Sequence, residues 1–325
     1  MGVFAYCLVV LRTIRGGDEG AFVPRMAVLF AVALAFVVIG CLIYFIHHVS
    51  SSLQASNIIE SVAEETIHAI DRLFPAEMGE AAGPSSGSSP PSASEAWQAI
   101  PARRTGYIQS VDGDALLGLA RERNAVIRME RGVGEFVVDG APLASVAGNK
   151  PLDEETASKL NALYSIGRHR TTVQDAGYGI RQIVDVALKA LSPGINDTTT
   201  AVICVDYLGA ILTRLVKRQI EPPYRTDEGK LLVIARGPTF ASLLGEAFDQ
   251  IRQNAEGNVA VLVRLLEAMG VIAGATADDH RRRALRQQVD LVAETMQRSV
   301  DSSYDRAAVQ AARDRVMPML GGKAE

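Results

Sequence analysis

The sequence predicts a mainly α-helical protein in which a transmembrane helix continues into a helical stalk, followed by a small β-rich module and a C-terminal helical domain with an αα-hairpin. One apolar run is long enough to cross a bilayer, and apolar residues recur every three to four positions after it and across the C-terminal half. Short alternating segments separate these two helical regions. The expected domains are a membrane region 1–47 (apolar stub 1–11, full span 26–46), a stalk 48–75, a flexible linker 76–98, a β-rich module 99–150, a helical domain 151–318 and a frayed tail 319–325.

The membrane segment is the strongest signal in the sequence. Residues 26–46 read MAVLFAVALAFVVIGCLIYFI and contain no charged side chain. About thirteen Val, Leu, Ile and Phe residues, at roughly −0.4 kcal/mol each, favour insertion by on the order of 5 kcal/mol. Two later apolar stretches are expected to be core helices because charged residues interrupt them, namely Asp206 and Arg214 in 200–216 and Arg264 and Glu267 in 258–275.

The first eleven residues, MGVFAYCLVVL, are apolar but only about half as long as a span, and Arg12 ends them. Three interpretations remain open: a truncated start, a re-entrant stub and a signal sequence. A signal sequence is disfavoured because no basic region precedes the run and no small-residue cleavage site follows it. We favour the truncated start.

Three regions follow the span. Apolar residues such as Ile59, Val62 and Ile70 keep helical spacing until Pro75, which predicts the stalk. The Gly, Ser and Pro composition of 76–94 predicts a flexible linker. The segments GYIQSVDGDALLGLA, AVIRM and EFVVDGAPLASV then predict the β-rich module.

Composition excludes several classes of protein. With Lys+Arg 33 against Asp+Glu 37, the net charge is −4, so no broad basic field is present to bind nucleic acid. Cys7, Cys41 and Cys204 lie far apart and form no metal or redox motif. The sequence also lacks a nucleophile elbow, a P-loop, a dinucleotide fingerprint and a calcium loop. We expect no cofactor, no metal and no assigned catalytic residue.

The clearest amphipathic helix is predicted over 171–191. We expect Thr171 or Thr172 as its N-cap, with Asp175 in its first turn, and the sequence Ser-Pro-Gly at 192–194 as its end. Asn196 or Asp197 then caps a second helix over 198–217, so that the SPGIND segment joins an αα-hairpin.

Charged residues around this hairpin form the candidate ligand-binding site. They are Arg168, Arg170, Asp175, Arg181, Asp185, Asn196 and Asp197. Arginine forks suit phosphate or carboxylate ligands, and paired carboxylates suit hard cations. A structural interpretation competes and is preferred: an i,i+4 ion pair between Arg181 and Asp185, and a helix cap at Asp197.

Downstream, residues 224–235 predict a β-hairpin, and helices are expected from Thr239, over 259–271 and over 278–300. Four arginines near the start of the last helix, Arg281, Arg282, Arg283 and Arg286, could touch anionic lipid, although a solvated helix start is the preferred interpretation.

Three segments resemble a known family: YCLVVLRTIRGGDEGAFVPRMAV, CLIYFIHHVSSSLQASNII and RTTVQDAGYGIRQIVDVALKALSPGINDTTTA. They are similar, in order and spacing, to the bacterial predicted-membrane-protein family catalogued as domain of unknown function 2254, and SPGIND is the most specific part. The resemblance implies multi-pass membrane placement, with further hydrophobic segments upstream and Met1 inside the third membrane helix. It implies no particular biochemical activity.

Orientation is contested between two observations. Arg12, Arg15 and Arg25 precede the span and no Lys or Arg follows it until Arg72, which favours an external C-terminal domain. The resemblance implies the opposite, because four spans return the C-terminal region to the cytoplasm. We expect the chain to lie in the bacterial plasma (inner) membrane, with its C-terminal domain in the cytoplasm.

Two functional hypotheses follow. The first is a non-catalytic integral membrane protein that senses, scaffolds or gates at the bilayer surface. The alternative is a membrane-tethered enzyme, such as a hydrolase, with an Asp/Arg site around the SPGIND turn. The expected partner is the lipid bilayer, with no nucleic acid; self-association as a homo-oligomer and a small-molecule ligand of unknown identity are left open.

Overall fold

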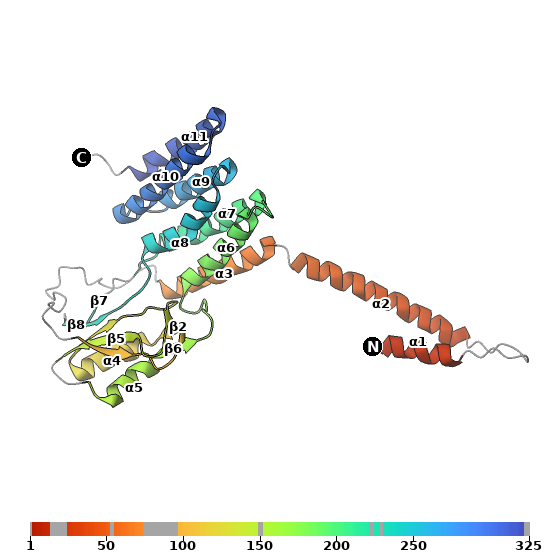
Figure 1. Cartoon of the computed structure of the whole chain (residues 1–325), viewed down its shortest axis with the longest axis horizontal. Helices are drawn as coiled ribbons and strands as arrows, with labels where there is room; N and C mark the ends of the chain where they lie inside the picture. The colour runs from red at the N-terminus through yellow and green to blue at the C-terminus, as the bar shows by residue number, and fades with distance from the viewer. Residues whose placement is uncertain are drawn as a thin grey trace, which may run out of the picture. The chain divides into compact units, whose positions relative to one another are not determined.

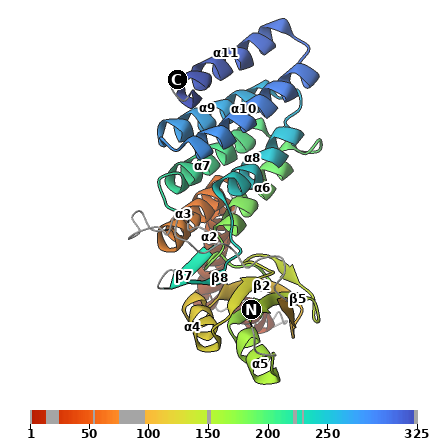
Figure 2. The same cartoon turned by 90° about the vertical axis from the view of Figure 1, so that its left-hand side faces the viewer.

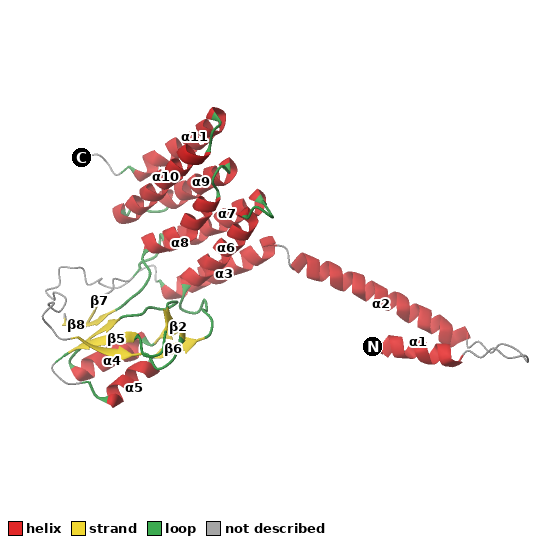
Figure 3. Cartoon of the chain, in the orientation of Figure 1, coloured by secondary structure: helices red, strands yellow, loops and turns green. Residues whose placement is uncertain are grey.

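The computed structural model describes residues 2–13, 25–52, 55–74, 97–148, 152–220, 224–227 and 230–321. The chain divides into two units, Met1–Ile58 and Ile59–Glu325, which we describe separately. The described residues form eleven helices and eight strands, so the fold is mainly helical, as the sequence predicts (Figure 1 and Figure 3).

The first unit contains α1 (Gly2–Thr13) and α2 (Arg25–Ser52). The two helices are in contact, because the ring of Tyr6 packs edge-on against that of Phe30 at 5.6 Å and its hydroxyl donates a 3.4 Å hydrogen bond to the Ala27 carbonyl. The apolar stub therefore forms a helix paired with α2. The apolar part of α2, residues 25–45, is not buried inside the protein, as expected for a helix whose apolar side chains face lipid.

Helix α3 (Ala55–Leu73) carries the expected stalk sequence and packs against the helical domain. One face of α3 is buried, and its members are Ile59, Ala63, Thr66, Ala69 and Ile70. Near its C-terminus, Asp71 forms an ion pair with Arg214 at 2.6 Å. The pKa of Asp71 is therefore held below its ordinary value, chiefly by the hydrogen bond from Arg214.

Two sheets form the β-rich part of the second unit. The strands are β1 (Trp97–Pro101), β2 (Gly106–Val111), β3 (Val126–Met129), β4 (Phe136–Val137), β5 (Pro142–Ala147), β6 (Tyr164–Gly167), β7 (Tyr224–Asp227) and β8 (Lys230–Ile234). One sheet has the order β1-β5-β3-β8-β7 and the other has the order β4-β2-β6. The predicted 224–235 hairpin is confirmed, and its strand β8 pairs in parallel with β3, which comes about a hundred residues earlier.

Two helices accompany the sheets: α4 (Gly113–Arg123) and α5 (Glu154–Ala162). The prediction that the α4 segment belongs to the β-rich pattern is wrong, because this segment is a helix. Asp112 caps this helix by accepting a hydrogen bond from the Ala115 amide, and Leu116 and Leu119 face the core. The expected linker 76–98 lies outside the described residues up to 96, and β1 begins at Trp97.

Six helices form three stacked hairpins (Figure 2). They are α6 (Ala176–Leu191), α7 (Thr198–Leu215), α8 (Phe240–Asn254), α9 (Val259–Gly274), α10 (Asp279–Ser299) and α11 (Ser303–Leu320). Helix α8 lies between α6 and α10 in one row, and α9 lies between α7 and α11 in the other. The predicted αα-hairpin is the first of these three.

Helices α7 and α9 pack against each other and bury most of their apolar residues, as expected for core helices. Helix α7 is also long and apolar enough to cross a membrane by length and composition. Its apolar residues, however, contact α6 and α9, and Cys204, Leu208 and Leu212 are fully buried. Helix α7 therefore uses its apolar surface inside the domain.

The end of the chain differs from the expectation. The sequence pattern indicates no separate helix after α10 and predicts a frayed tail over 319–325, yet α11 remains helical through Leu320. Leu320 is buried, and its carbonyl accepts a 2.6 Å hydrogen bond from Arg286. This contact fixes the last turn of α11.

Candidate functional site

The centre of the site is a bidentate ion pair between Arg170 and Asp175. Nε of Arg170 lies 2.8 Å from Oδ2 of Asp175, and Nη2 lies 3.0 Å from Oδ1. The guanidinium also lies 5.5 Å from the centre of the Tyr178 ring. Burial lowers the pKa of Arg170, but the hydrogen bonds to Asp175 outweigh it and raise that pKa above its ordinary value.

Asp175 also sets the start of α6. Its Oδ1 accepts a 3.1 Å hydrogen bond from the Tyr178 amide, so Asp175 is the N-cap, and the expectation of a cap at Thr171 or Thr172 is wrong. The hydroxyl of Thr172 instead donates to Glu65 on α3. The predicted end of the helix is confirmed, with Ser192 as the C-cap.

A cavity of about 720 Å³ opens beside this ion pair, a volume typical of small-molecule sites. Its walls come from the turn after β3, the start of α6, the segment after β8 and the start of α8. Six charged side chains line it: Glu135, Arg170, Asp175, Arg225, Arg236 and Glu246. Glycines at 132, 134, 177 and 237 also line it, so backbone groups can approach a ligand closely there.

Glu246 on α8 brings a second carboxylate close to Arg170. Its Oε1 lies 3.9 Å from Nη1 of Arg170. Burial, with a smaller contribution from the negative charge of Asp175, raises the pKa of Glu246 above its ordinary value of 4.5, while Arg170 opposes the shift. Arg170 therefore lies between two carboxylates that come from different helices.

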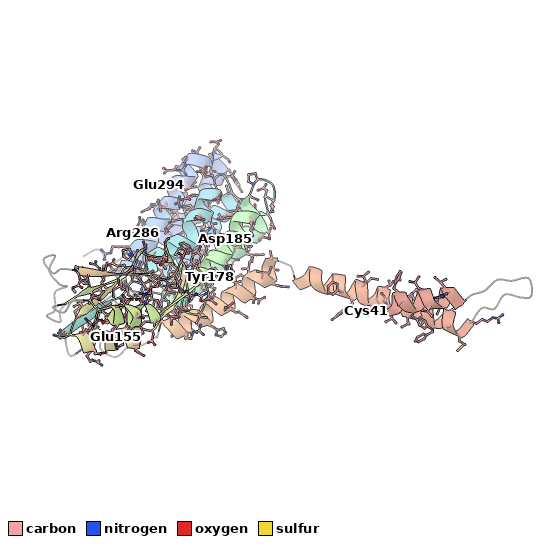
Figure 4. All side chains as sticks on the ribbon, turned by 60° about the horizontal axis from the view of Figure 1, so that its bottom comes forward. Cys41, Glu155, Tyr178, Asp185, Arg286 and Glu294 are labelled. Atoms are coloured by element: carbon pink, nitrogen blue, oxygen red, sulfur yellow. The ribbon has the colours of Figure 1, made fainter. Side chains whose placement is uncertain are left out.

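The other predicted residues lie elsewhere. Arg181 pairs with Asp185 at 2.6 Å along α6 and donates a 2.9 Å hydrogen bond to Gln250 on α8. Asp185 and Tyr178 are labelled at different levels of α6 in Figure 4. The side chain of Arg168 is exposed to solvent and does not line the cavity.

Asn196 and Asp197 follow the C-terminal end of α6, whereas Arg170 and Asp175 precede its N-terminal end. The 16 residues of α6 separate its two ends by about 24 Å. Asp197 caps α7 through the Thr200 amide at 3.0 Å, and hydrogen bonds from Thr200 lower the pKa of Asp197. Asn196 adopts a left-handed conformation with φ of +48°. Of the seven predicted residues, the cavity brings together only Arg170 and Asp175.

Four charged side chains that line the cavity are not among the predicted residues: Glu135, Arg225, Arg236 and Glu246. Each lies more than about thirty residues from Arg170, so helical spacing gives no signal for their proximity. Arg236 donates a 2.8 Å hydrogen bond to Glu135, which joins the segment after β8 to the turn after β3. Among the described residues, no group of three or more His, Cys, Asp or Glu side chains is arranged to hold a metal ion.

Comparison with known proteins identifies the family. The profile of the family described as "Predicted membrane protein (DUF2254)" matches residues 1–270. The chain belongs to this family. The SPGIND hairpin and the cavity around Arg170 both lie within the part of the chain that matches DUF2254.

Two curated relatives are uncharacterized proteins, Mb1321c of Mycobacterium bovis and Rv1290c of Mycobacterium tuberculosis. Each is 35% identical to this chain over 326 aligned positions, which cover 98% of the chain and 61% of the relative. The chain thus spans about three-fifths of the length of these relatives. No solved structure matches the chain.

Proposed function

We propose that the chain is a non-catalytic membrane-anchored sensing protein whose helical domain binds a small acidic molecule in the cavity around Arg170. Helix α2 supplies the anchor, because its uncharged apolar run has the length of a bilayer span. The observation that carries the proposal is the cavity itself, in which arginines from three separate segments converge.

The cavity favours an acidic ligand for two reasons. A guanidinium has five N–H donors, more than one carboxylate can accept, so Arg170 and Arg236 can each hold a carboxylate and still bind a ligand oxygen. The glycines that line the cavity add backbone groups at close range. A phosphate or carboxylate group is the chemistry that such donors recognise.

Sensing fits the geometry better than catalysis. The enzyme hypothesis uses Asp185 or Asp197 together with Arg170, and these carboxylates lie outside the cavity. Asp175 remains inside it but is held by Arg170 and by the α6 amide of Tyr178. A ligand in the cavity would contact both the sheet segments and the helices that line it. Binding that joins these two parts stabilises the folded domain, and a change in stability can serve as a signal.

For location, we propose the bacterial plasma membrane with the C-terminal domain in the cytoplasm. DUF2254 membership supports the membrane, and the resemblance to multi-pass members supports the cytoplasmic side against the local charge bias of Arg12 and Arg25. A fluorescent protein fused after Glu325 of the chain, within its full-length gene, should fluoresce in cells if this orientation holds. An alkaline phosphatase fusion at the same position should be inactive.

Binding is tested by calorimetric titration of the detergent-solubilised chain with inorganic phosphate and with citrate. At least one probe should bind and be recovered unchanged. Arg170→Met should weaken binding by about tenfold or more, whereas the control Arg181→Met, in α6 and outside the cavity, should retain it. Binding that survives Arg170→Met, or no binding of either probe, contradicts the proposal.

One observation supports the enzyme alternative. Burial raises the pKa of Glu246 beside Arg170, so its carboxyl keeps a proton to a higher pH than an ordinary glutamate does, as a proton donor requires. Under this alternative, a probe ester or phosphoester would be consumed by the wild type and left intact by Glu246→Gln.

A further inference from the structure

A second cavity adjoins the one around Arg170. Its volume is about 800 Å³, and the segment 236–238 lines both cavities, as do Ile220 and Arg225. The other walls of the second cavity come from the end of β3, the start of α8 and the start of α10. A ligand bound at the shared residues can therefore reach into both cavities.

Apolar side chains line much of the second cavity. Met129 at the end of β3 and Phe240 at the start of α8 are both buried, and Pro238 lies next to Thr239, the N-cap of α8. The thioether of methionine and the ring of phenylalanine both pack favourably against aromatic rings. The second cavity therefore suits an aromatic group.

Two charged residues of the second cavity form contacts within the protein. The guanidinium of Arg281 donates hydrogen bonds to the carbonyls of Val216 and Arg218 and lies 5.7 Å from the centre of the Phe240 ring. Asp278 accepts a 3.0 Å hydrogen bond from the Arg281 amide as the N-cap of α10. Because the carboxylate of Asp278 repels a negative charge beside it, this end of the cavity suits the uncharged part of a ligand.

Arg236 places the acidic end of such a ligand at the junction of the two cavities. Its Nε donates a 2.8 Å hydrogen bond to Glu135, which lines the first cavity and not the second. The charged end of Arg236 thus faces the first cavity, which also contains Arg170. An acidic group bound there leaves the rest of the molecule to extend into the second cavity.

We propose that the ligand of this domain is an aryl acid, whose phosphate or carboxylate group binds in the first cavity and whose aromatic group occupies the second, against Met129 and Phe240. The inference rests on the proposed function, because the acidic group uses the site around Arg170. It adds a basis for specificity: the second cavity selects among acids by the group attached to them. A bare acid fills only the first cavity and binds more weakly than the same acid with an aromatic group.

The test is calorimetric titration of the detergent-solubilised full chain with two probes that share one acidic group, methylphosphonate and phenylphosphonate. Titration of each probe into the same detergent without protein corrects for binding to micelles. Phenylphosphonate should bind about tenfold more tightly than methylphosphonate, or better, because its ring is removed from water in the second cavity.

Variants that fill the second cavity locate this gain. Ala284→Trp places a large side chain in the cavity from α10, and it should abolish most of the preference for the phenyl group while changing methylphosphonate affinity by less than about twofold. Ala241→Trp does the same from an exposed position in α8, which gives a second variant if circular dichroism shows that the first does not fold. The control Ala293→Trp, also half-buried in α10 but outside both cavities, should keep the preference.

Equal affinity for the two phosphonates would overturn this inference, as would a phenyl preference that survives both filling variants. In either case the proposed function stands if methylphosphonate binding is lost in Arg170→Met, because that variant tests the acidic site separately. If neither phosphonate binds, the site around Arg170 is itself contradicted, and this inference falls with it.

Discussion

Gly134 approaches Asp175 so closely that a Cβ atom at position 134 would lie inside van der Waals contact with Oδ2 of the carboxylate. The same Cβ would lie 3.1 Å from Nη2 of Arg170. Gly134 also has φ of +84°, a conformation that side chains other than glycine's rarely adopt. The turn after β3 therefore packs directly against the ion pair at the start of α6, with no space for a side chain at position 134.

Gly134→Ala should destabilise the chain more than Gly140→Ala. Both positions have positive φ, so each substitution costs about 1 kcal/mol of backbone strain, but Gly140 has open space where a Cβ would be. The clash with Asp175 should add about 1–3 kcal/mol at Gly134 alone. Thermal unfolding followed by circular dichroism in detergent measures the difference, and equal costs would show that the close approach is absent.

Asp175→Asn and Asp175→Ala should separate the two roles of this side chain. Asparagine can still cap α6 but leaves the half-buried Arg170 without its partner, which should cost about 2 kcal/mol. Alanine removes the cap as well and should cost about 1 kcal/mol more. Unfolding midpoints in urea provide the comparison. If the two variants are equally stable, Asp175 does not act as the cap.

Stability should depend on pH through Glu246. Because its pKa is raised in the folded state, the folded chain binds more protons than the unfolded chain above pH 4.5, so this group's stabilising contribution is lost as the pH rises through its folded pKa. Glu246→Gln should remove this loss. The stability of the variant relative to wild type should increase from pH 4 to pH 7.5, and a relative stability that is flat or falls over this range would contradict the assignment.

Arg281→Ala should destabilise the chain by about 1–2 kcal/mol, whereas Arg283→Ala should have little effect. Arg281 donates to the carbonyls of Val216 and Arg218 after α7, while Arg283 donates to the backbone carbonyl of Asp279 in its own helix at 3.3 Å. Thermal unfolding measures both variants. Similar losses would indicate that these arginines act only through general charge.

The sequence predicted those features that depend on local periodicity. The α2 span, the αα-hairpin and the 224–235 hairpin follow from length, spacing and turn residues. The start of α6 was misplaced because Thr171, Thr172 and Asp175 are all good caps, and only the contact with Arg170 selects Asp175. That contact depends on tertiary structure.

The site was predicted only in part for the same reason. Arg170 and Asp175 are close in sequence, so both were identified, whereas Glu246 reaches them through the packing of α8 on α6. Asp197 has a charged side chain like theirs, but α6 holds it at the other end. Charge density along the chain does not show which end of a helix a residue occupies.

The most direct test of the membrane anchor is alkaline carbonate extraction of bacterial membranes that contain the chain. The wild type should remain in the membrane pellet. A variant with Val37→Arg and Val38→Arg, near the middle of α2, should be released, because two arginines cost about 5–7 kcal/mol, enough to cancel the favourable insertion energy. A wild-type chain recovered in the carbonate supernatant would contradict the anchor, and with it the proposal that the helical domain works at a bilayer surface.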